Sequence, residues 1–310
     1  MATAFSENLT AEQQSQVLQL FQQFQHPTLQ KDLIELKTLK KVEKGGDVLR
    51  IELQLPFAWN TGVEQVKQQL SDTLLKATHS KEIKWVVNYQ IATLKRANNQ
   101  PAVKGVKNII AVTSGKGGVG KSSVSVNLAL ALQAQGARVG ILDADIYGPS
   151  IPHMLGAPHQ RPTSPDNQHI TPIKAHGLSA NSIGFLMDED NATIWRGPMA
   201  SSALSQLLNE TLWDSLDYLV IDMPPGTGDI QLTLSQQIPV TGAVVVTTPQ
   251  DIALLDAVKG VSMFERVSVP VLGIVENMSM HICSNCGHHE AIFGTGGAEK
   301  MAQKYNVKVL

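Results

Sequence analysis

The amino-acid sequence predicts an α/β fold, in which a doubly wound, mostly parallel sheet over residues 106–310 is preceded by a small α+β domain over residues 1–95. Three observations predict it. After residue 106, short apolar strands alternate with helical stretches, which is typical of a parallel sheet covered on both faces. A glycine-rich loop joins the first of these strands to a helix. The polar residues 96–105 separate the two parts and are predicted to be a linker.

The first domain is predicted to follow the order helix, strand, strand, helix, strand. Helices are expected where a capping box precedes apolar residues on one face, and strands where apolar and polar residues alternate. Gly45-Gly46 marks the turn of a hairpin between the first two strands. The expected elements are a helix from the capping box at residues 10–13, strands over 33–42 and 48–55, a helix from the capping box of Thr61 and Glu64, and a strand over 83–89.

The second domain is predicted from apolar runs of strand length that alternate with helical periodicity. Residues 156–184 are rich in proline and have little periodicity, so they are expected to form a surface insertion with one short hairpin. Residues 307–310 have a strand pattern, and we expect the natural domain to continue beyond them. The expected strands are 107–113, 138–143, 217–222, 242–248 and 271–276, and the expected helices are 120–135, 198–213 and 251–267.

The glycine-rich loop reads Gly-Lys-Gly-Gly-Val-Gly-Lys-Ser and matches the phosphate-loop pattern G-x-x-x-x-G-K-[ST]. Glycines let successive backbone N–H groups face one set of phosphate oxygens, and the helix that follows adds roughly half a positive charge. Lys121 is expected to reach the β- and γ-phosphates, and the Ser122 hydroxyl to ligate Mg²⁺. The residues expected to bind nucleotide here are Gly115, Lys116, Gly117, Gly118, Val119, Gly120, Lys121, Ser122 and Ser123.

Three carboxylates end predicted strands at the edge of the sheet where ligands of open α/β sheets bind. Asp222 ends an apolar strand before Pro-Pro-Gly and is expected to hold the Mg²⁺ shell, with a helix-capping aspartate as the structural alternative. Asp143 and Asp145 end the strand over 138–143. Asp145 is the better candidate to orient the attacking water, and Asp143 to support the structure or the Mg²⁺ shell.

The composition argues against several classes of protein. A formal net charge of −2 with no basic cluster predicts no nucleic-acid binding. The N-terminus lacks a basic region followed by an apolar stretch, and no apolar run is long enough to span a bilayer, so we expect neither secretion nor membrane insertion. Only two cysteines occur, which excludes a disulfide framework and predicts a reducing cytoplasm with a metal or redox role for the pair.

The two cysteines, Cys283 and Cys286, form a C-x-x-C motif that can chelate one side of a metal centre. A tetrahedral zinc or a [4Fe-4S] cluster requires four ligands, so a two-fold dimer axis would supply the other pair. A zinc loop within one subunit, with His281 or His288, is an alternative, as is a redox dithiol. His289 is expected to be a surface or supporting group.

The doubled-lysine loop resembles that of the deviant Walker A ATPases, and the chain is identified within that class as similar to the Mrp/ApbC iron–sulfur cluster carrier ATPases. The resemblance covers roughly residues 105–310. The motifs that carry it, besides the loop, are Asp143-Ala-Asp-Ile-Tyr-Gly-Pro-Ser150, Trp195-Arg-Gly-Pro198, Asp222-Met-Pro-Pro-Gly-Thr-Gly-Asp229, Thr248-Pro-Gln-Asp251, Val275-Glu-Asn-Met-Ser279 and Cys283-Ser-Asn-Cys286.

This resemblance implies an ATPase that binds a shared iron–sulfur cluster, expected to be [4Fe-4S], at a homodimer interface and passes it to apoproteins, in contact with cluster-assembly proteins. It implies that Lys116 acts on the partner's phosphates, that Asn277 contacts the adenine, and that the loop of Pro249 and Gln250 flanks it. The first domain resembles the small MIP18-type domain. Where relatives of that domain often carry a cysteine, residues 56–60 have none, so no metal role is expected there.

Two other functions fit an ATPase of this class. A positioning ATPase of the chromosome-partitioning or septum-positioning type would bind DNA or membrane, and the absence of a basic patch and the presence of C-x-x-C count against it. An electron donor like the nitrogenase iron protein would need a redox-active cluster, which the sequence leaves open.

Overall fold

The computed structural model describes residues 3–97, 100–187 and 197–310. The chain separates into two compact units, Met1–Ala92 with Ala134–Ala137 and Thr93–Gln133 with Arg138–Leu310, each with its own core. None of the described helices combines the length and the apolar character needed to cross a bilayer.

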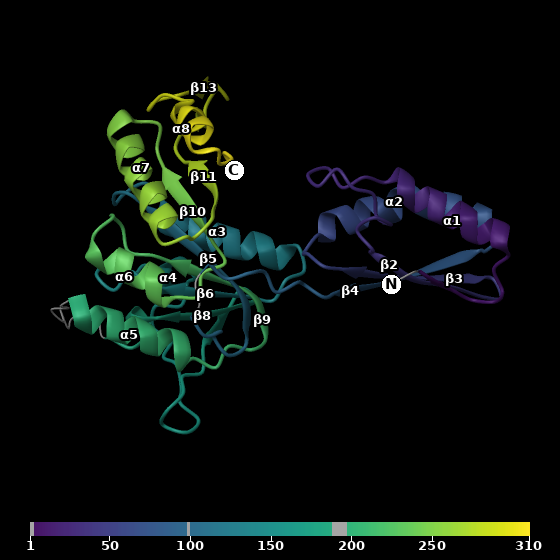
Figure 1. The fold of residues 1–310 in the computed structure, drawn as a ribbon, viewed down its shortest axis with the longest axis horizontal. Coiled ribbons are helices and arrows are strands. Elements are labelled where there is room, and N and C mark those ends of the chain that lie inside the picture. Colours follow the sequence, from purple (N-terminus) through teal and green to yellow (C-terminus); the bar gives the residue numbers. More distant parts are fainter. Residues whose placement is uncertain (1–2, 98–99, 188–196) are drawn as a thin grey trace. The chain divides into compact units, whose positions relative to one another are not determined.

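The first unit is a four-stranded sheet covered by two helices (Figure 1). The strand order is β1-β2-β3-β4; β2 and β3 pair antiparallel, and the outer pairs are parallel. Val17 and Phe21 of the first helix and Leu74 of the second pack with alternate residues of the strands to form the core. The elements are β1 (Ala4–Phe5), α1 (Ala11–Gln23), β2 (Leu39–Gly45), β3 (Val48–Leu55), α2 (Asn60–Thr78) and β4 (Glu82–Tyr89).

The N-terminal capping box is confirmed, because Thr10 and Gln13 exchange hydrogen bonds between side chain and backbone. The second predicted capping box is wrong. Helix α2 begins at Asn60, so Thr61 already lies inside the first turn, and Glu64 forms an ion pair with Lys67 at 2.7 Å instead.

The predicted strand over 33–42 is also wrong in its first half, because β2 begins only at Leu39. The Asp32 carboxylate accepts hydrogen bonds from the N–H groups of Ile34 and Glu35, which folds this segment into a turn. At Lys37 the backbone adopts a φ of 55°, which ends the turn in the left-handed region.

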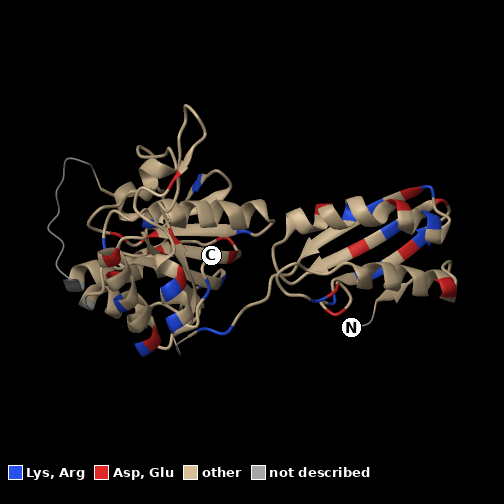
Figure 2. Cartoon of the chain, turned by 90° about the horizontal axis from the view of Figure 1, so that it is seen from above, with Lys and Arg blue, Asp and Glu red and all other residues tan. Residues whose placement is uncertain are grey.

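Charges of both signs alternate on the strands of this first sheet (Figure 2). Glu43 lies opposite Arg50, and Lys41 lies opposite Glu52. Opposite charges in register stabilise neighbouring strands.

The second unit contains a seven-stranded sheet of order β11-β10-β5-β9-β6-β8-β7, in which only the edge pair β7–β8 is antiparallel. The predicted doubly wound, mostly parallel fold is therefore confirmed. Its elements are β5 (Val106–Ser114), α3 (Lys121–Ala134), β6 (Val139–Asp143), α4 (Ile151–Met154), β7 (Ile173–Ala175), β8 (Leu178–Ser182), the 3-10 turn η1 (Ile183–Phe185), α5 (Gly197–Asn209), β9 (Leu216–Asp222), α6 (Asp229–Gln237), β10 (Gly242–Thr247), α7 (Asp251–Arg266), β11 (Val271–Glu276), β12 (His281–Ile282), β13 (His289–Glu290) and α8 (Gly297–Tyr305).

The central strands are buried on both faces, as their continuous apolar runs predict. Residues of α5 and α6 pack with Ile109 and Leu219, while α7 and α8 pack with Val245 and Ile274. The segment 156–184 differs from prediction only in its hairpin. Residues 159–171 are largely exposed, as expected of a surface insertion, and the hairpin β7–β8 is present, but β8 is fully buried and pairs with β6, so the hairpin extends the main sheet.

Two smaller differences concern the helices and the chain's end. Helices α4, α6 and α8 were not among the predicted helices. The predicted terminal strand is present only as an isolated bridge, in which Val309 lies parallel to Ile274 of β11.

Candidate functional site

The phosphate loop connects β5 to α3, and its glycines are required by both conformation and space. Gly118 and Gly120 have φ angles of 78° and 83°, where a side chain would be strained. A Cβ on Gly120 would also lie 2.2 Å from the Asn277 side-chain nitrogen. A Cβ on Gly115 would lie 2.3 Å from the main chain of Asp256 in α7. The loop therefore packs directly against Asn277 and against α7.

Asp222 is at the centre of a buried polar cluster at the start of α3. Its carboxylate accepts hydrogen bonds from the hydroxyls of Ser122 and Ser125, both at 2.6 Å. The Lys121 ammonium lies 2.8 Å from the same carboxylate and 3.8 Å from that of Asp145. Lys121 and Asp222 are both buried, so this ion pair is shielded from solvent.

Asp143 and Asp145 occupy different environments, although only one residue separates them. Asp143 is fully buried and accepts hydrogen bonds from Ser182 and from the N–H groups of Asp145 and Ile151. Burial, and then the nearby charge of Asp222, raise the pKa of Asp143 to about 7. Asp145 is half-buried, and burial raises its pKa while Lys121 opposes that rise.

Asn277 and Pro249, the predicted adenine contacts, lie in different surroundings. The Asn277 side-chain nitrogen donates a hydrogen bond of 2.9 Å to the carbonyl of Val119, so it touches the phosphate loop. Pro249 and Gln250 line a cavity of about 310 Å³ together with Phe293 and Lys300, and Asn277 is not among its described lining residues.

Lys116 is half-exposed, and its carbonyl accepts a hydrogen bond from the Ser114 hydroxyl. No ion pair of its ammonium is present among the described residues. Of the predicted Trp195 motif, Trp195 and its neighbour at 196 lie outside the described residues.

The C-x-x-C motif lies in the loop of the short hairpin β12–β13. The Cys283 N–H donates to the His288 carbonyl, and the Gly287 N–H donates to the Cys283 carbonyl, each at 2.9 Å. Hydrogen bonds from the backbone of Cys286 and Asn285, and from the Cys286 thiol, lower the pKa of Cys283. Within the described ranges, no three His, Cys, Asp or Glu side chains converge as a metal site.

Comparison with known proteins shows which family this chain belongs to. Residues 105–310 match the family described as ParA, NUBPL iron-transfer P-loop NTPase. The chain belongs to this family. A protein of Haemophilus influenzae called iron–sulfur cluster carrier protein is 91% identical over the whole chain and 84% of its own length. A protein of the same description from Escherichia coli is 69% identical over 93% of the chain and 78% of its own length.

A solved structure supports the fold of this NTPase. A nucleotide-binding protein of Archaeoglobus fulgidus in complex with ADP is 40% identical, with a TM-score of 0.58. The similarity covers 66% of this chain and 82% of that one.

Two residues that contact Asp222 or the segments next to it and to the phosphate loop were missed from the sequence. Ser125 lies one turn after Lys121 on α3, and this spacing could have indicated that its hydroxyl reaches the same carboxylate. Gln231 of α6 donates hydrogen bonds to Thr113 of β5 and to the Pro224 carbonyl. No sequence pattern signals that role, because α6 itself was not predicted.

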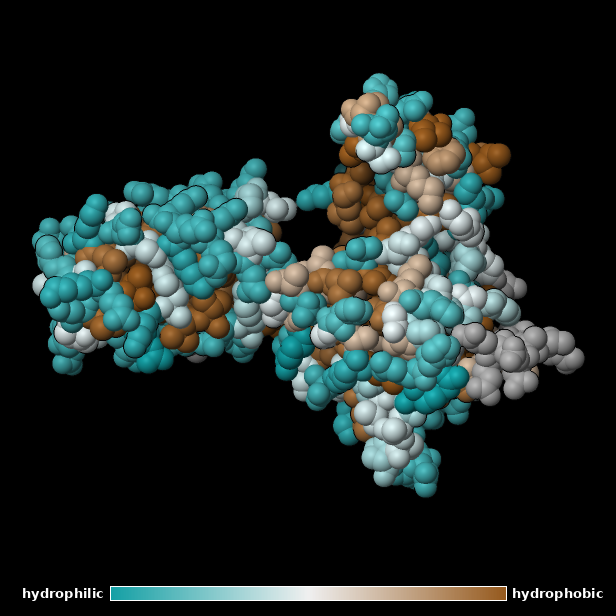
Figure 3. All heavy atoms as spheres, turned by 180° about the vertical axis from the view of Figure 1, so that it is seen from behind, coloured by the Kyte–Doolittle hydropathy of each residue, from teal (hydrophilic) through white to brown (hydrophobic). Residues whose placement is uncertain are grey.

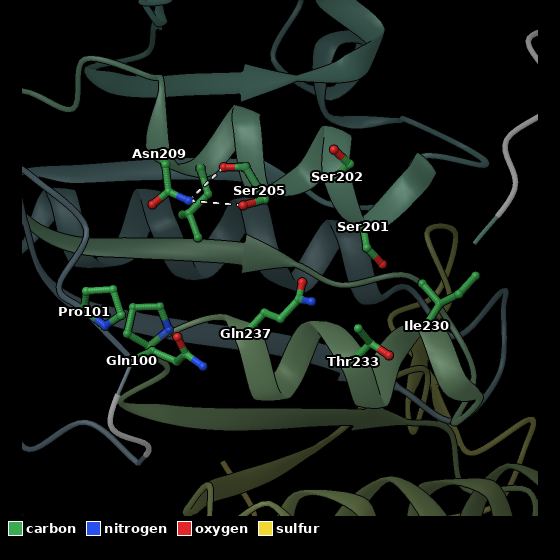
Figure 4. Close-up of a pocket in the computed structure, with 11 residues that line it drawn as sticks. Gln100, Pro101, Ser201, Ser202, Ser205, Asn209, Ile230, Thr233 and Gln237 are labelled. Carbon is green, nitrogen blue, oxygen red and sulfur yellow. Dashed lines mark hydrogen bonds between the residues drawn. The ribbon is translucent and has the colours of Figure 1, made fainter. Parts of the chain in front are cut away.

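A larger cavity of about 980 Å³ lies elsewhere, between α5 and α6 (Figure 4). Ser201, Ser205 and Asn209 face it from α5, and Thr233 and Gln237 from α6. Its described lining residues carry no charge and include none of the predicted site residues.

Proposed function

We propose that this chain is an ATP-hydrolysing iron–sulfur cluster carrier that holds its cluster between two copies of itself and passes it to apoproteins. One observation carries the proposal. The hairpin with the two free thiols lies in the same compact unit as the phosphate loop, where Lys121 and Ser122 contact Asp222. The names of its relatives and of its family support the same function.

The residues around Lys121 fit a magnesium–nucleotide complex. The Ser122 hydroxyl and the Asp222 carboxylate meet at 2.6 Å, and oxygen atoms of these types are the ligands that Mg²⁺ prefers. Mg²⁺ held by them would neutralise charge that develops on the β- and γ-phosphates. The loop amides and Lys121 would bind the phosphates from the other side.

Asp145 is our candidate for orienting the attacking water. It lies within 3.8 Å of Lys121, and its raised pKa makes its carboxylate a better proton acceptor than an ordinary aspartate. Asp143 is enclosed by hydrogen-bond donors, and we assign it a supporting role.

The Lys121 ammonium lies 2.8 Å from the Asp222 carboxylate, which is the proposed metal ligand. We propose that nucleotide binding breaks the Lys121–Asp222 pair and frees the carboxylate for the metal. Lys116, half-exposed on the loop, would act on the phosphates of the partner subunit, so hydrolysis would require the homodimer.

The cluster is the cargo, and we propose a [4Fe-4S] cluster shared by Cys283 and Cys286 of two subunits. The lack of a third ligand among the described neighbours favours this arrangement over a zinc loop within one subunit. Exposed apolar side chains surround the hairpin: Met278, Met280, Ile282, Ile292 and Phe293. Figure 3 shows apolar surface at this end of the second unit. Such a surface favours pairing of two copies.

Anaerobic reconstitution of the full chain with iron and sulfide tests the proposal. We expect one cluster, about four irons, per two chains, and loss of the cluster in both Cys283→Ser and Cys286→Ser. ATP hydrolysis should persist in both variants, because the cysteines contribute nothing to the phosphate loop. One zinc ion per chain with no uptake of iron would contradict the carrier function and leave the ATPase function intact.

A further inference from the structure

The two oxygens of the Asp222 carboxylate have different partners on α3. Ser125 follows Ser122 by three residues and Lys121 by four, so the three side chains project from the same side of the helix. The Lys121 ammonium lies 2.8 Å from Oδ1, and the Ser125 hydroxyl donates a hydrogen bond of 2.6 Å to the same oxygen. Among the described residues, Oδ2 accepts a hydrogen bond only from the Ser122 hydroxyl.

Burial indicates from which side this carboxylate can be approached. Lys121, Ser125 and Asp222 are buried, whereas Ser122 is half-buried. A metal ion therefore approaches from the Ser122 side, where the serine hydroxyl and Oδ2 are the two oxygen atoms that fit Mg²⁺. Oδ1 stays with the buried groups.

Ser125 does not need Asp222 to satisfy its hydroxyl. Its Oγ also lies 3.0 Å from the carbonyl of Lys121, one turn earlier on the helix. Ser235 of α6 is likewise buried, and its hydroxyl donates to the carbonyl of Gln231 at 2.8 Å, its one hydrogen bond within the described part of the chain. A hydroxyl carries one proton, and the shorter contact places the proton of Ser125 on Asp222. Ser125 thus donates to the carboxylate although a backbone acceptor is within reach.

We propose that Ser125 is a positioning residue for the metal of the nucleotide site, because it holds Oδ1 of Asp222 and so keeps Oδ2 beside Ser122. The inference rests on the proposed ATPase function and deepens it. The hydrogen bond from Ser125 does not involve Lys121, so it persists if nucleotide draws the ammonium away. Without this hydroxyl the carboxylate can turn about its Cβ–Cγ bond. Hydrogen bonds to metal-binding side chains are typically worth about 10- to 100-fold in metal affinity.

The test compares Ser125→Ala with Ser235→Ala, which removes a hydroxyl of the same burial and the same contact with its own helix. Electron paramagnetic resonance of Mn²⁺, added to the full chain with equimolar ADP, measures the metal affinity. We expect Ser125→Ala to bind Mn²⁺ about tenfold or more weakly than wild type. Its affinity for ADP in EDTA, measured by calorimetry, should stay within about twofold of wild type, because the loop amides and Lys121 bind the phosphates. Ser235→Ala should match wild type in both.

Equal Mn²⁺ affinity in Ser125→Ala and wild type would overturn the proposal. Parallel losses of Mn²⁺ affinity and of ADP affinity in EDTA would also overturn it, since they indicate a general structural role. If Ser125→Ala fails to fold, Ser125→Cys decides, because a thiol is a weak donor of similar shape. Wild-type Mn²⁺ affinity in that variant rejects the positioning role. A wild-type chain that binds ADP but holds no more Mn²⁺ than ADP alone would instead reject the proposed magnesium–nucleotide site itself.

Discussion

At Asp222, several groups compete for one carboxylate. Lys121, Ser122 and Ser125 all lie within 2.8 Å of its two oxygens, and the side chain is fully buried. A metal ion can enter only by replacing some of these contacts. In the proposed mechanism, binding of nucleotide and metal is therefore an exchange of partners around one aspartate.

This exchange predicts different effects for the two loop lysines. Lys121→Ala should abolish nucleotide binding and hydrolysis, because it removes the buried cation of the loop and leaves Asp222 without its ion pair. Lys116→Ala should keep much of the binding and lose hydrolysis and ATP-dependent dimer closure, because Lys116 is proposed to act across the dimer. Nucleotide titration with size measurement in solution checks both. Equal loss of ATP affinity in the two variants would contradict the in-trans role.

Asp143 predicts a pH dependence of stability. Its pKa is about 7 in the folded protein against 3.8 ordinarily, so between these values the folded state keeps a proton that the unfolded state loses. The stability due to this proton is complete below pH 3.8 and is lost as pH rises through 7. Asp143→Asn should therefore flatten the change in unfolding free energy between pH 4 and 7, measured by urea titration. A slope identical to wild type would contradict the raised pKa.

The site residues that the sequence predicts are those that a contiguous motif carries, such as the loop of 115–122 or the C-x-x-C pair. Their catalytic and binding roles remain predictions. Ser125 and Gln231 were missed because their importance comes from what they touch after folding. A lone polar residue within a helix looks the same in sequence whether it faces solvent or a buried carboxylate.

At the scale of elements, Glu276 joins the end of β11 to α8. Its carboxylate accepts hydrogen bonds from the Ser279 hydroxyl and from the N–H groups of Gly296 and Ala298. The last two belong to the start of α8, where free N–H groups and the helix dipole favour a negative charge. The segment that leads into the cysteine hairpin is thus fixed at its base.

Glu276→Gln should lower the unfolding free energy by about 1–3 kcal/mol, because the amide turns an N–H group toward backbone donors. Glu299→Gln, in the exposed first turn of α8, is the matched control and should cost less than about 1 kcal/mol. Hydrogen exchange in α8 should rise only in the first variant. Equal effects of the two substitutions would show that charge near the helix, not this contact, stabilises α8.

Element prediction succeeded where periodicity and burial agree, as in β5, β9 and β10, whose apolar runs are buried on both faces. The strand predicted over residues 33–38 is absent because the Asp32 carboxylate accepts the hydrogen bonds of a turn there. The apolar residues of this segment resemble a strand in sequence and give no sign of that turn. The prediction misplaced β8 because prolines before it suggested a surface segment, whereas pairing with β6 depends on contacts distant in sequence.

At the scale of the whole molecule, the first unit has a core of its own, formed by residues from both helices and its sheet. A fragment of residues 1–95 should therefore fold alone and unfold cooperatively in urea, with the same transition followed by circular dichroism and by Trp fluorescence. Non-coincident or non-cooperative transitions would show that this part of the chain needs the rest.

The exposure of the cysteine hairpin has a practical consequence. Cys286 is exposed and Cys283 half-exposed, and β12 and β13 pair through only two residues each. Peroxide and dissolved oxygen reach these sulfur atoms as readily as a cargo does, and nearby thiols can oxidise to a disulfide or beyond. Damage in air would begin there while the sheet stays intact. A preparation could then melt normally and still hold no cluster, and a count of free thiols would reveal the loss.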